Sequence, residues 1–116
     1  MRIEAPVRGV HVVGLGQVVR LAAAIRCQTV PLDDAGTPDP GAFRQLHQML
    51  ADCYPLVHQK LKREVFNGYS LLYTWEGSDP AAKPIALMAH QDVVPIAPGT
   101  EKAWQADPFA GTVRDG

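Results

Sequence analysis

Residues 85–95 read IALMAHQDVVP, an apolar run that ends in a histidine and an aspartate. The run at 85–89 is short and uninterrupted, which is typical of a strand covered on both faces of a sheet. It stops at His90, and Asp92 follows two residues later. Because residues i and i+2 of an extended backbone point to the same side, His90 and Asp92 are predicted to project together, while Gln91 points away.

A histidine and an aspartate placed in this way suit a metal site. Neutral imidazole is a common zinc ligand, and its second ring nitrogen usually donates to a carboxylate or carbonyl that fixes the tautomer. His90 is therefore our candidate metal ligand, and Asp92 the candidate residue that orients it. The alternative is a hydrogen-bonded histidine at a strand end, with Asp92 capping a turn before Pro95. Two residues do not make a zinc site, which needs at least three protein ligands.

Two helices are predicted upstream of this stretch. Apolar side chains recur at helical spacing over residues 17–26 and again over 41–53. Asp39 is placed to cap the start of the second helix, with Pro40 in its first turn. Pro55 should end or kink that helix, with one further turn after it.

A hairpin follows the second helix. Strands are predicted at about 62–66 and 69–76, because Asn67-Gly68 between them is a strong signal for a two-residue turn. With 85–89 as a third strand, the order is helix, helix, hairpin, strand. The predicted fold class is α/β, with two helices packed on a small mixed sheet and a further short strand near the end of the sequence.

Composition sets the broad class of the protein. The chain has 116 residues, enough for one small domain, with 47% hydrophobic and 20% charged residues, as in ordinary globular proteins. A net charge of −1 gives no basic surface for nucleic acid or anionic lipid.

Cys27 and Cys53 are interpreted as reduced core thiols, with a single disulfide as the alternative. No segment is apolar and long enough to span a bilayer, so we predict a cytoplasmic location unless an export signal precedes the present start.

Three stretches of the sequence, one of them overlapping the stretch at 85–95, resemble a known family. They are the turn GSDP at 77–80, the stretch MAHQDVVP at 88–95, and the spaced pattern Trp104…DPFAG…DG that ends at Gly116. Together they resemble the start of the catalytic domain in the zinc aminoacylase and carboxypeptidase S family of metallopeptidases. Residues 17–116 are then expected to be an incomplete, N-terminal portion of a dizinc-peptidase catalytic domain, and residues 1–16 stay unassigned.

The resemblance implies a chemistry and assigns residues to it. Members of this family hydrolyse an amide with a water held between two zinc ions. His90 matches the first metal ligand, and Asp92 matches the acidic residue that orients it. A loop with Trp104, Pro108 and Phe109 is expected to pack beneath the site.

The rest of the family's site follows its DG position, where this sequence stops. It comprises a bridging aspartate, a base glutamate, a further carboxylate and a distal histidine. The chain is thus predicted to be a fragment of a zinc-dependent amidohydrolase or exopeptidase acting on peptides or N-acyl amino acids, and to be inactive without the missing C-terminal part.

Two other functions stay open at this point. Gly14 and Gly16 precede a predicted helix, as in a dinucleotide-binding unit, and Asp33 follows about twenty residues on. The third glycine of that motif is replaced by Val19, whose side chain obstructs close helix packing. A non-catalytic α/β interaction module is the second alternative, because an incomplete layer leaves a sheet edge open.

Other side chains within the chain do not complete a site. The remaining histidines have no metal-type spacing with each other or with a cysteine, and the candidate nucleophiles lack a histidine and carboxylate at a suggestive place. The histidines are His11, His47 and His58, and the nucleophiles are Ser70, Ser78 and the two cysteines.

Overall fold

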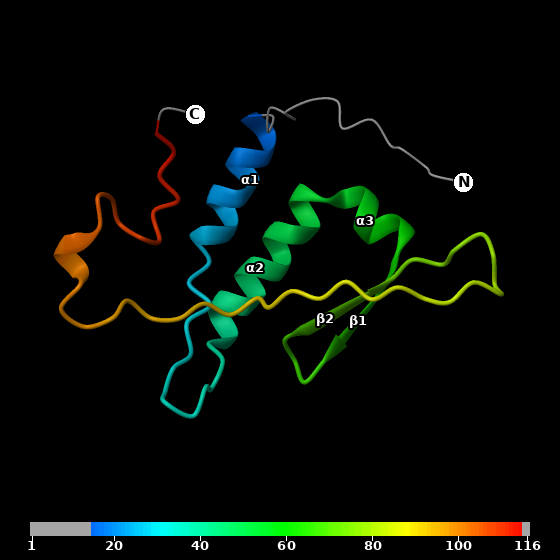
Figure 1. Cartoon of the computed structure of the whole chain (residues 1–116), viewed down its shortest axis with the longest axis horizontal. Coiled ribbons are helices and arrows are strands. Elements are labelled where there is room, and N and C mark those ends of the chain that lie inside the picture. The colour runs from blue at the N-terminus through cyan, green and yellow to red at the C-terminus, as the bar shows by residue number, and fades with distance from the viewer. Residues whose placement is uncertain (1–14, 115–116) are drawn as a thin grey trace, which may run out of the picture.

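The computed structural model describes residues 15–114, which form three α-helices, a two-stranded sheet and one short 3-10 helix (Figure 1). The helices are α1 (Leu15–Ile25), α2 (Pro40–Cys53) and α3 (Pro55–Lys60). The strands are β1 (Lys62–Phe66) and β2 (Ser70–Thr74), and the 3-10 helix is η1 (Glu101–Ala103). The predicted order of helix, helix and hairpin is confirmed, and the described residues combine helices with a small sheet, as the predicted α/β class requires.

Helix α2 begins where its capping residues predict. The Asp39 carboxylate accepts hydrogen bonds from the backbone N–H groups of Gly41 at 2.7 Å and Ala42 at 3.3 Å. Pro40 occupies the first turn, where its missing N–H costs nothing. The helix ends at Cys53, and Pro55 starts α3 as a separate short helix after a break at Tyr54.

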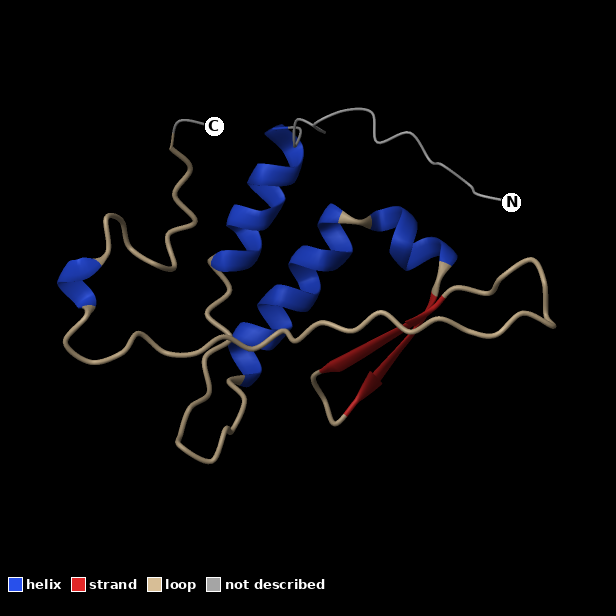
Figure 2. Cartoon of the chain, viewed as in Figure 1, coloured by secondary structure: helices blue, strands red, loops and turns tan. Residues whose placement is uncertain are grey.

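The core lies between α1 and α2, which run antiparallel and side by side (Figure 2). It is small, and Phe43 is its largest member. Cys27 and Cys53 are both free thiols, the first buried and the second half-buried, and burial raises the pKa of the Cys27 thiol. The buried residues are Ala22, Cys27, Thr29, Ala42, Phe43 and Leu46.

The hairpin turns at Asn67-Gly68 as predicted, but three residues, 67–69, separate the paired strand ends, one more than in the predicted two-residue turn. β1 and β2 pair antiparallel from Lys62 opposite Thr74 to Phe66 opposite Ser70. Asn67 and Gly68 have φ values of 50° and 81°, both in the left-handed region that a type I′ turn requires. The hairpin meets α2 through the rings of Tyr69 and Phe43, whose centroids lie 5.2 Å apart.

The predicted third strand is wrong for the described residues. Residues 85–89 form no strand, and Ile85, Leu87 and Met88 are 88%, 94% and 93% exposed. Within 15–114 the sheet has two antiparallel strands and is not mixed, and the two main helices pack on each other. A strand forms only where a neighbour takes up its backbone hydrogen bonds, and among the described residues none does so for 85–89.

The overall dimensions agree with an open arrangement. The Cα radius of gyration is 18.1 Å, whereas a compact domain of this length has about 13 Å. Within residues 15–114, no helix combines the length and the apolar character that crossing a bilayer demands.

Candidate functional site

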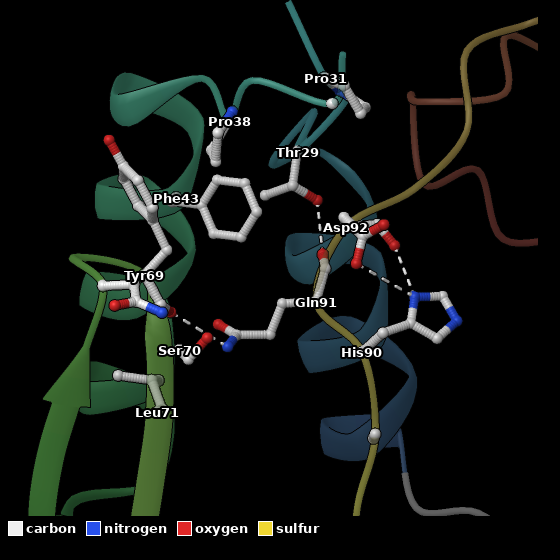
Figure 3. Close-up of a pocket in the computed structure, with 13 residues that line it drawn as sticks. Thr29, Pro31, Pro38, Phe43, Tyr69, Ser70, Leu71, His90, Gln91 and Asp92 are labelled. Atoms are coloured by element: carbon white, nitrogen blue, oxygen red, sulfur yellow. Dashed lines mark hydrogen bonds and ion pairs between the residues drawn. The ribbon is translucent and has the colours of Figure 1, made fainter. Parts of the chain in front are cut away.

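His90 and Asp92 lie together at the surface. The Nδ1 atom of His90 is 2.7 Å from the backbone oxygen of Asp92 and 3.6 Å from its carboxylate Oδ1 (Figure 3). Their side chains are 83% and 61% exposed. The two side chains therefore project to the same side, as their spacing predicts, and Gln91 points to the opposite side (Figure 3).

The contact with the Asp92 carbonyl fixes which nitrogen of His90 is free for a ligand. A backbone carbonyl only accepts hydrogen bonds, so Nδ1 of His90 carries the hydrogen and donates it. In the neutral ring the lone pair then sits on Nε2, and within residues 15–114 no group hydrogen-bonds that atom. The sequence predicts the carboxylate as the orienting group, but the shorter contact is to the backbone oxygen of the same residue.

Segment 91–93 is held to three other parts of the chain. The Thr29 hydroxyl donates to the backbone oxygen of Gln91 at 2.6 Å, and the N–H of Val93 donates to the Thr29 carbonyl at 3.2 Å. The Gln91 amide reaches the carbonyl of Tyr69 at 3.2 Å and Nε2 of His47 at 2.9 Å. These contacts come from the loop after α1, from the hairpin turn just before β2 and from α2.

A surface pocket of about 650 Å³ adjoins the pair (Figure 3). Its volume falls within the range of small-molecule sites. One wall is mostly apolar and comes from the α1–α2 loop, α2 and the hairpin, and the opposite wall is the segment with His90. The lining residues labelled in Figure 3 are Thr29, Pro31, Pro38, Phe43, Tyr69, Ser70, Leu71, His90, Gln91 and Asp92.

Asp33 shapes the loop that brings Pro31 and Pro38 to this pocket. Its carboxylate accepts hydrogen bonds from the Thr37 hydroxyl at 2.6 Å and from the Thr37 N–H at 2.9 Å. These bonds, that of the Thr37 hydroxyl first, hold the pKa of Asp33 below its ordinary value. The Asp33 carboxylate is thus occupied by hydrogen bonds within its own loop.

We expect Thr37→Ala to raise the pKa of Asp33, because the substitution removes the hydroxyl that favours the carboxylate. A lowered pKa stabilises the turn above the unfolded-state pKa, and this stabilisation is lost as pH falls through the folded-state value. The measurement is a carboxyl carbon titration by NMR. Thr37→Ser keeps the hydroxyl and is the control, and the same Asp33 pKa in Thr37→Ala and the wild type would contradict the assignment.

The loop with Trp104, Pro108 and Phe109 does not lie beneath the site. Trp104 is 53% exposed, and none of the three residues lines the pocket. The loop lies against α1, where Arg26 Nε donates to the Ala110 carbonyl at 2.9 Å. That expectation from the family resemblance is therefore wrong for the described residues, and the loop has a packing role elsewhere.

The other histidines within 15–114 have structural partners. His47 bonds Gln91, and His58 lies 3.0 Å from the Tyr54 carbonyl and 2.8 Å from the Tyr73 hydroxyl. Across the described residues, no three His, Cys, Asp or Glu side chains are grouped to hold a metal ion. His90 thus fits as one ligand of a metal, and the described residues do not supply the other ligands.

The glycine pair of the dinucleotide alternative is only partly described. Gly16 lies inside α1, and Gly14 and His11 lie outside the described residues.

Comparison with known proteins finds relatives that are named as carboxypeptidases. Carboxypeptidase S of Saccharomyces cerevisiae is 43% identical over 99 residues, which cover 81% of this chain and 17% of that protein. The chain belongs to the carboxypeptidase S family. Probable carboxypeptidase S-like 1 of Dictyostelium discoideum is 40% identical over 76% of the chain and 18% of its own length.

The family similarity extends to proteins named for a different activity. The N-fatty-acyl-amino acid synthase/hydrolase PM20D1 of Xenopus tropicalis is 36% identical over 101 residues, 85% of this chain and 19% of that protein. The chain thus spans less than a fifth of the length of these relatives. No family model matches the chain, and no solved structure matches it.

Proposed function

We propose that this carboxypeptidase S-type chain is part of a zinc-dependent amidohydrolase that cleaves the amide bond of peptides or N-acyl amino acids. The names of its relatives, carboxypeptidase S and N-fatty-acyl-amino acid synthase/hydrolase, support this class of substrate. His90 is the zinc ligand in this proposal, and Asp92 holds its ring.

The orientation of the His90 ring is the observation that carries the proposal. Its Nδ1 lies 2.7 Å from the Asp92 carbonyl, which leaves Nε2 unprotonated in the neutral ring and turned to solvent. Metal-ligating histidines almost always donate their other N–H to a carboxylate, carbonyl or water in this manner. In the neutral ring, the lone pair on Nε2 is thus available to a metal ion.

Each residue of the pair has a defined task. Zinc, when bound, lowers the pKa of a coordinated water and polarises a carbonyl. His90 binds through Nε2, and the Asp92 carbonyl keeps the proton on Nδ1. The Asp92 carboxylate, 3.6 Å from Nδ1, adds a negative charge beside the ring that favours binding of a cation.

Zinc needs more ligands than this pair, so we further propose that the 116-residue chain does not turn over substrate alone. The test compares this chain with the product of the complete reading frame that contains it, each with zinc and an N-acyl amino acid. We expect hydrolysis by the complete product, its loss on chelation and its return with added zinc, and no turnover by the 116-residue chain.

Two outcomes would contradict the proposal. Hydrolysis by the complete product that survives exhaustive chelation would remove the role of zinc. Zinc-dependent turnover by the 116-residue chain at ordinary enzyme rates would show that its own residues complete the site.

A further inference from the structure

We propose that Gln91 is a positioning residue for His90: it ties the strand-end segment to α2 and to the hairpin, and so fixes the tautomer that presents Nε2 to a metal. The metal part of this inference rests on the function proposed above, but the effect on the tautomer does not. The Gln91 side chain and the His90 ring point to opposite sides of the segment (Figure 3).

The first step is that the two hydrogen bonds of the Gln91 amide have only one consistent assignment. The Tyr69 carbonyl accepts only, so the Gln91 NH₂ group donates to it at 3.2 Å. The amide oxygen then faces His47 and accepts from its Nε2–H at 2.9 Å. One half-buried side chain thus joins the segment to residues 22 and 44 positions earlier in the chain.

The second step is that the backbone around Gln91 is held on both sides. The Thr29 hydroxyl donates to the Gln91 carbonyl at 2.6 Å, and the Thr29 carbonyl accepts from the N–H of Val93 at 3.2 Å. Thr29 is only 2% exposed, so it is itself well fixed. The peptide carbonyl of Asp92, which accepts from His90, lies between these two anchored residues.

The third step is that nothing else described in the structure fixes this region. Within residues 15–114, the backbone of residues 83–90 makes no hydrogen bonds, and Leu87 and Met88 are over nine-tenths exposed. His90 is therefore at the end of an unpaired segment, and its orientation depends on the anchored residues 91–93 next to it. Without the Gln91 side-chain contacts, the Asp92 carbonyl would be held only through the Thr29 bonds, and its direction toward the His90 ring would be less well fixed.

The direct test is the tautomer of His90 in the metal-free chain, measured from ring nitrogen shifts by NMR. The measurement is made at alkaline pH, where the tautomers of neutral imidazole are compared. We expect Nδ1–H to predominate in the wild type. Gln91→Leu, which keeps the size but removes both hydrogen bonds, should lower the ratio of Nδ1–H to Nε2–H by about two- to tenfold, since one hydrogen bond is lost or weakened.

A second pair of variants keeps the test decisive if Gln91→Leu does not fold. Thr29→Val removes the hydroxyl bond to the Gln91 carbonyl at similar volume, and Thr29→Ser retains it. We expect the tautomer ratio to fall in Thr29→Val and to be retained in Thr29→Ser. Helix content and the melting temperature identify variants that keep the fold. An unchanged His90 tautomer in folded Gln91→Leu, or the same ratio in both Thr29 variants, would overturn the proposal.

The metal readout separates this inference from the proposed function. In the complete protein, Gln91→Leu should weaken zinc binding by about 10- to 100-fold, as loss of outer-shell partners typically does. A shifted tautomer in a protein that binds no zinc would leave the positioning role intact and refute the proposed function. An unshifted tautomer in a protein that proves to be a zinc-dependent hydrolase would refute the positioning role and leave the proposed function intact.

Discussion

Replacing His90 by alanine in the complete protein is expected to lower kcat/KM for an N-acyl amino acid by about 10³-fold or more. In the proposed function, a bound zinc ion would contribute several kcal/mol of transition-state stabilisation, and each 1.4 kcal/mol is about tenfold in rate. The imidazole is exposed and already carries its hydrogen on Nδ1, so its removal takes away a prepared ligand without disturbing a core. Zinc content measured on the same sample should fall with the rate.

Asp92→Asn and His58→Gln define how specific this effect is. Asp92→Asn keeps the backbone carbonyl that accepts from His90 and loses only the carboxylate, so a smaller loss of about 10- to 100-fold is expected. His58 is a histidine of the same chemistry, but its ring lies between Tyr54 and Tyr73, and His58→Gln should leave the rate within about twofold. Equal losses in His90→Ala and His58→Gln would mean that both variants act by damaging the fold.

The parts of the fold that the sequence predicts well depend on neighbours in the chain. Asn67-Gly68 turns the chain where expected because both residues tolerate positive φ, and strands flank the turn on both sides, although the connection is one residue longer than predicted. Asp39 caps α2 because its side chain needs only the next turn of backbone. Such features are decided over a few residues and are visible as short patterns.

The predicted strand at 85–89 depends on residues far away, and there the sequence pattern fails. Its apolar composition is compatible with a strand buried on both faces, but a strand also needs a partner backbone. Within the described residues the hairpin does not pair with it, and Ile85 and Leu87 stay exposed. An apolar run indicates which side chains would be buried, but it does not indicate whether a covering neighbour is present.

The sequence predicts on which side His90 and Asp92 project, but it does not predict their contacts. The spacing of His90 and Asp92 predicts their common side, yet only the structure shows that the backbone oxygen, and not the carboxylate, is the closer acceptor. Gln91 is predicted to point away, which is correct, but its bond to His47 spans 44 positions and leaves no local signal.

Among the described glycines, Gly111 is the position where an added methyl group should have the largest effect on stability. Its φ is +59°, and a Cβ added there would lie 2.5 Å from the backbone oxygen of Ala22 and 3.0 Å from its carbonyl carbon. Ala22 is buried in α1, so its backbone cannot move aside without disturbing the α1–α2 core. Gly111→Ala is therefore expected to lower the free energy of unfolding by about 3 kcal/mol, from backbone strain and the clash together.

Gly99→Ala separates these two causes. Gly99 has a similar φ of +85°, but its added Cβ would meet nothing within 4 Å, so only the strain of about 1 kcal/mol applies. Urea unfolding of both variants measures the difference, which isolates the contact of the loop with α1. If the two variants lose equal stability, the loop does not dock on Ala22, and the DPFAG pattern that ends at Gly111 would need a reason other than close packing on α1.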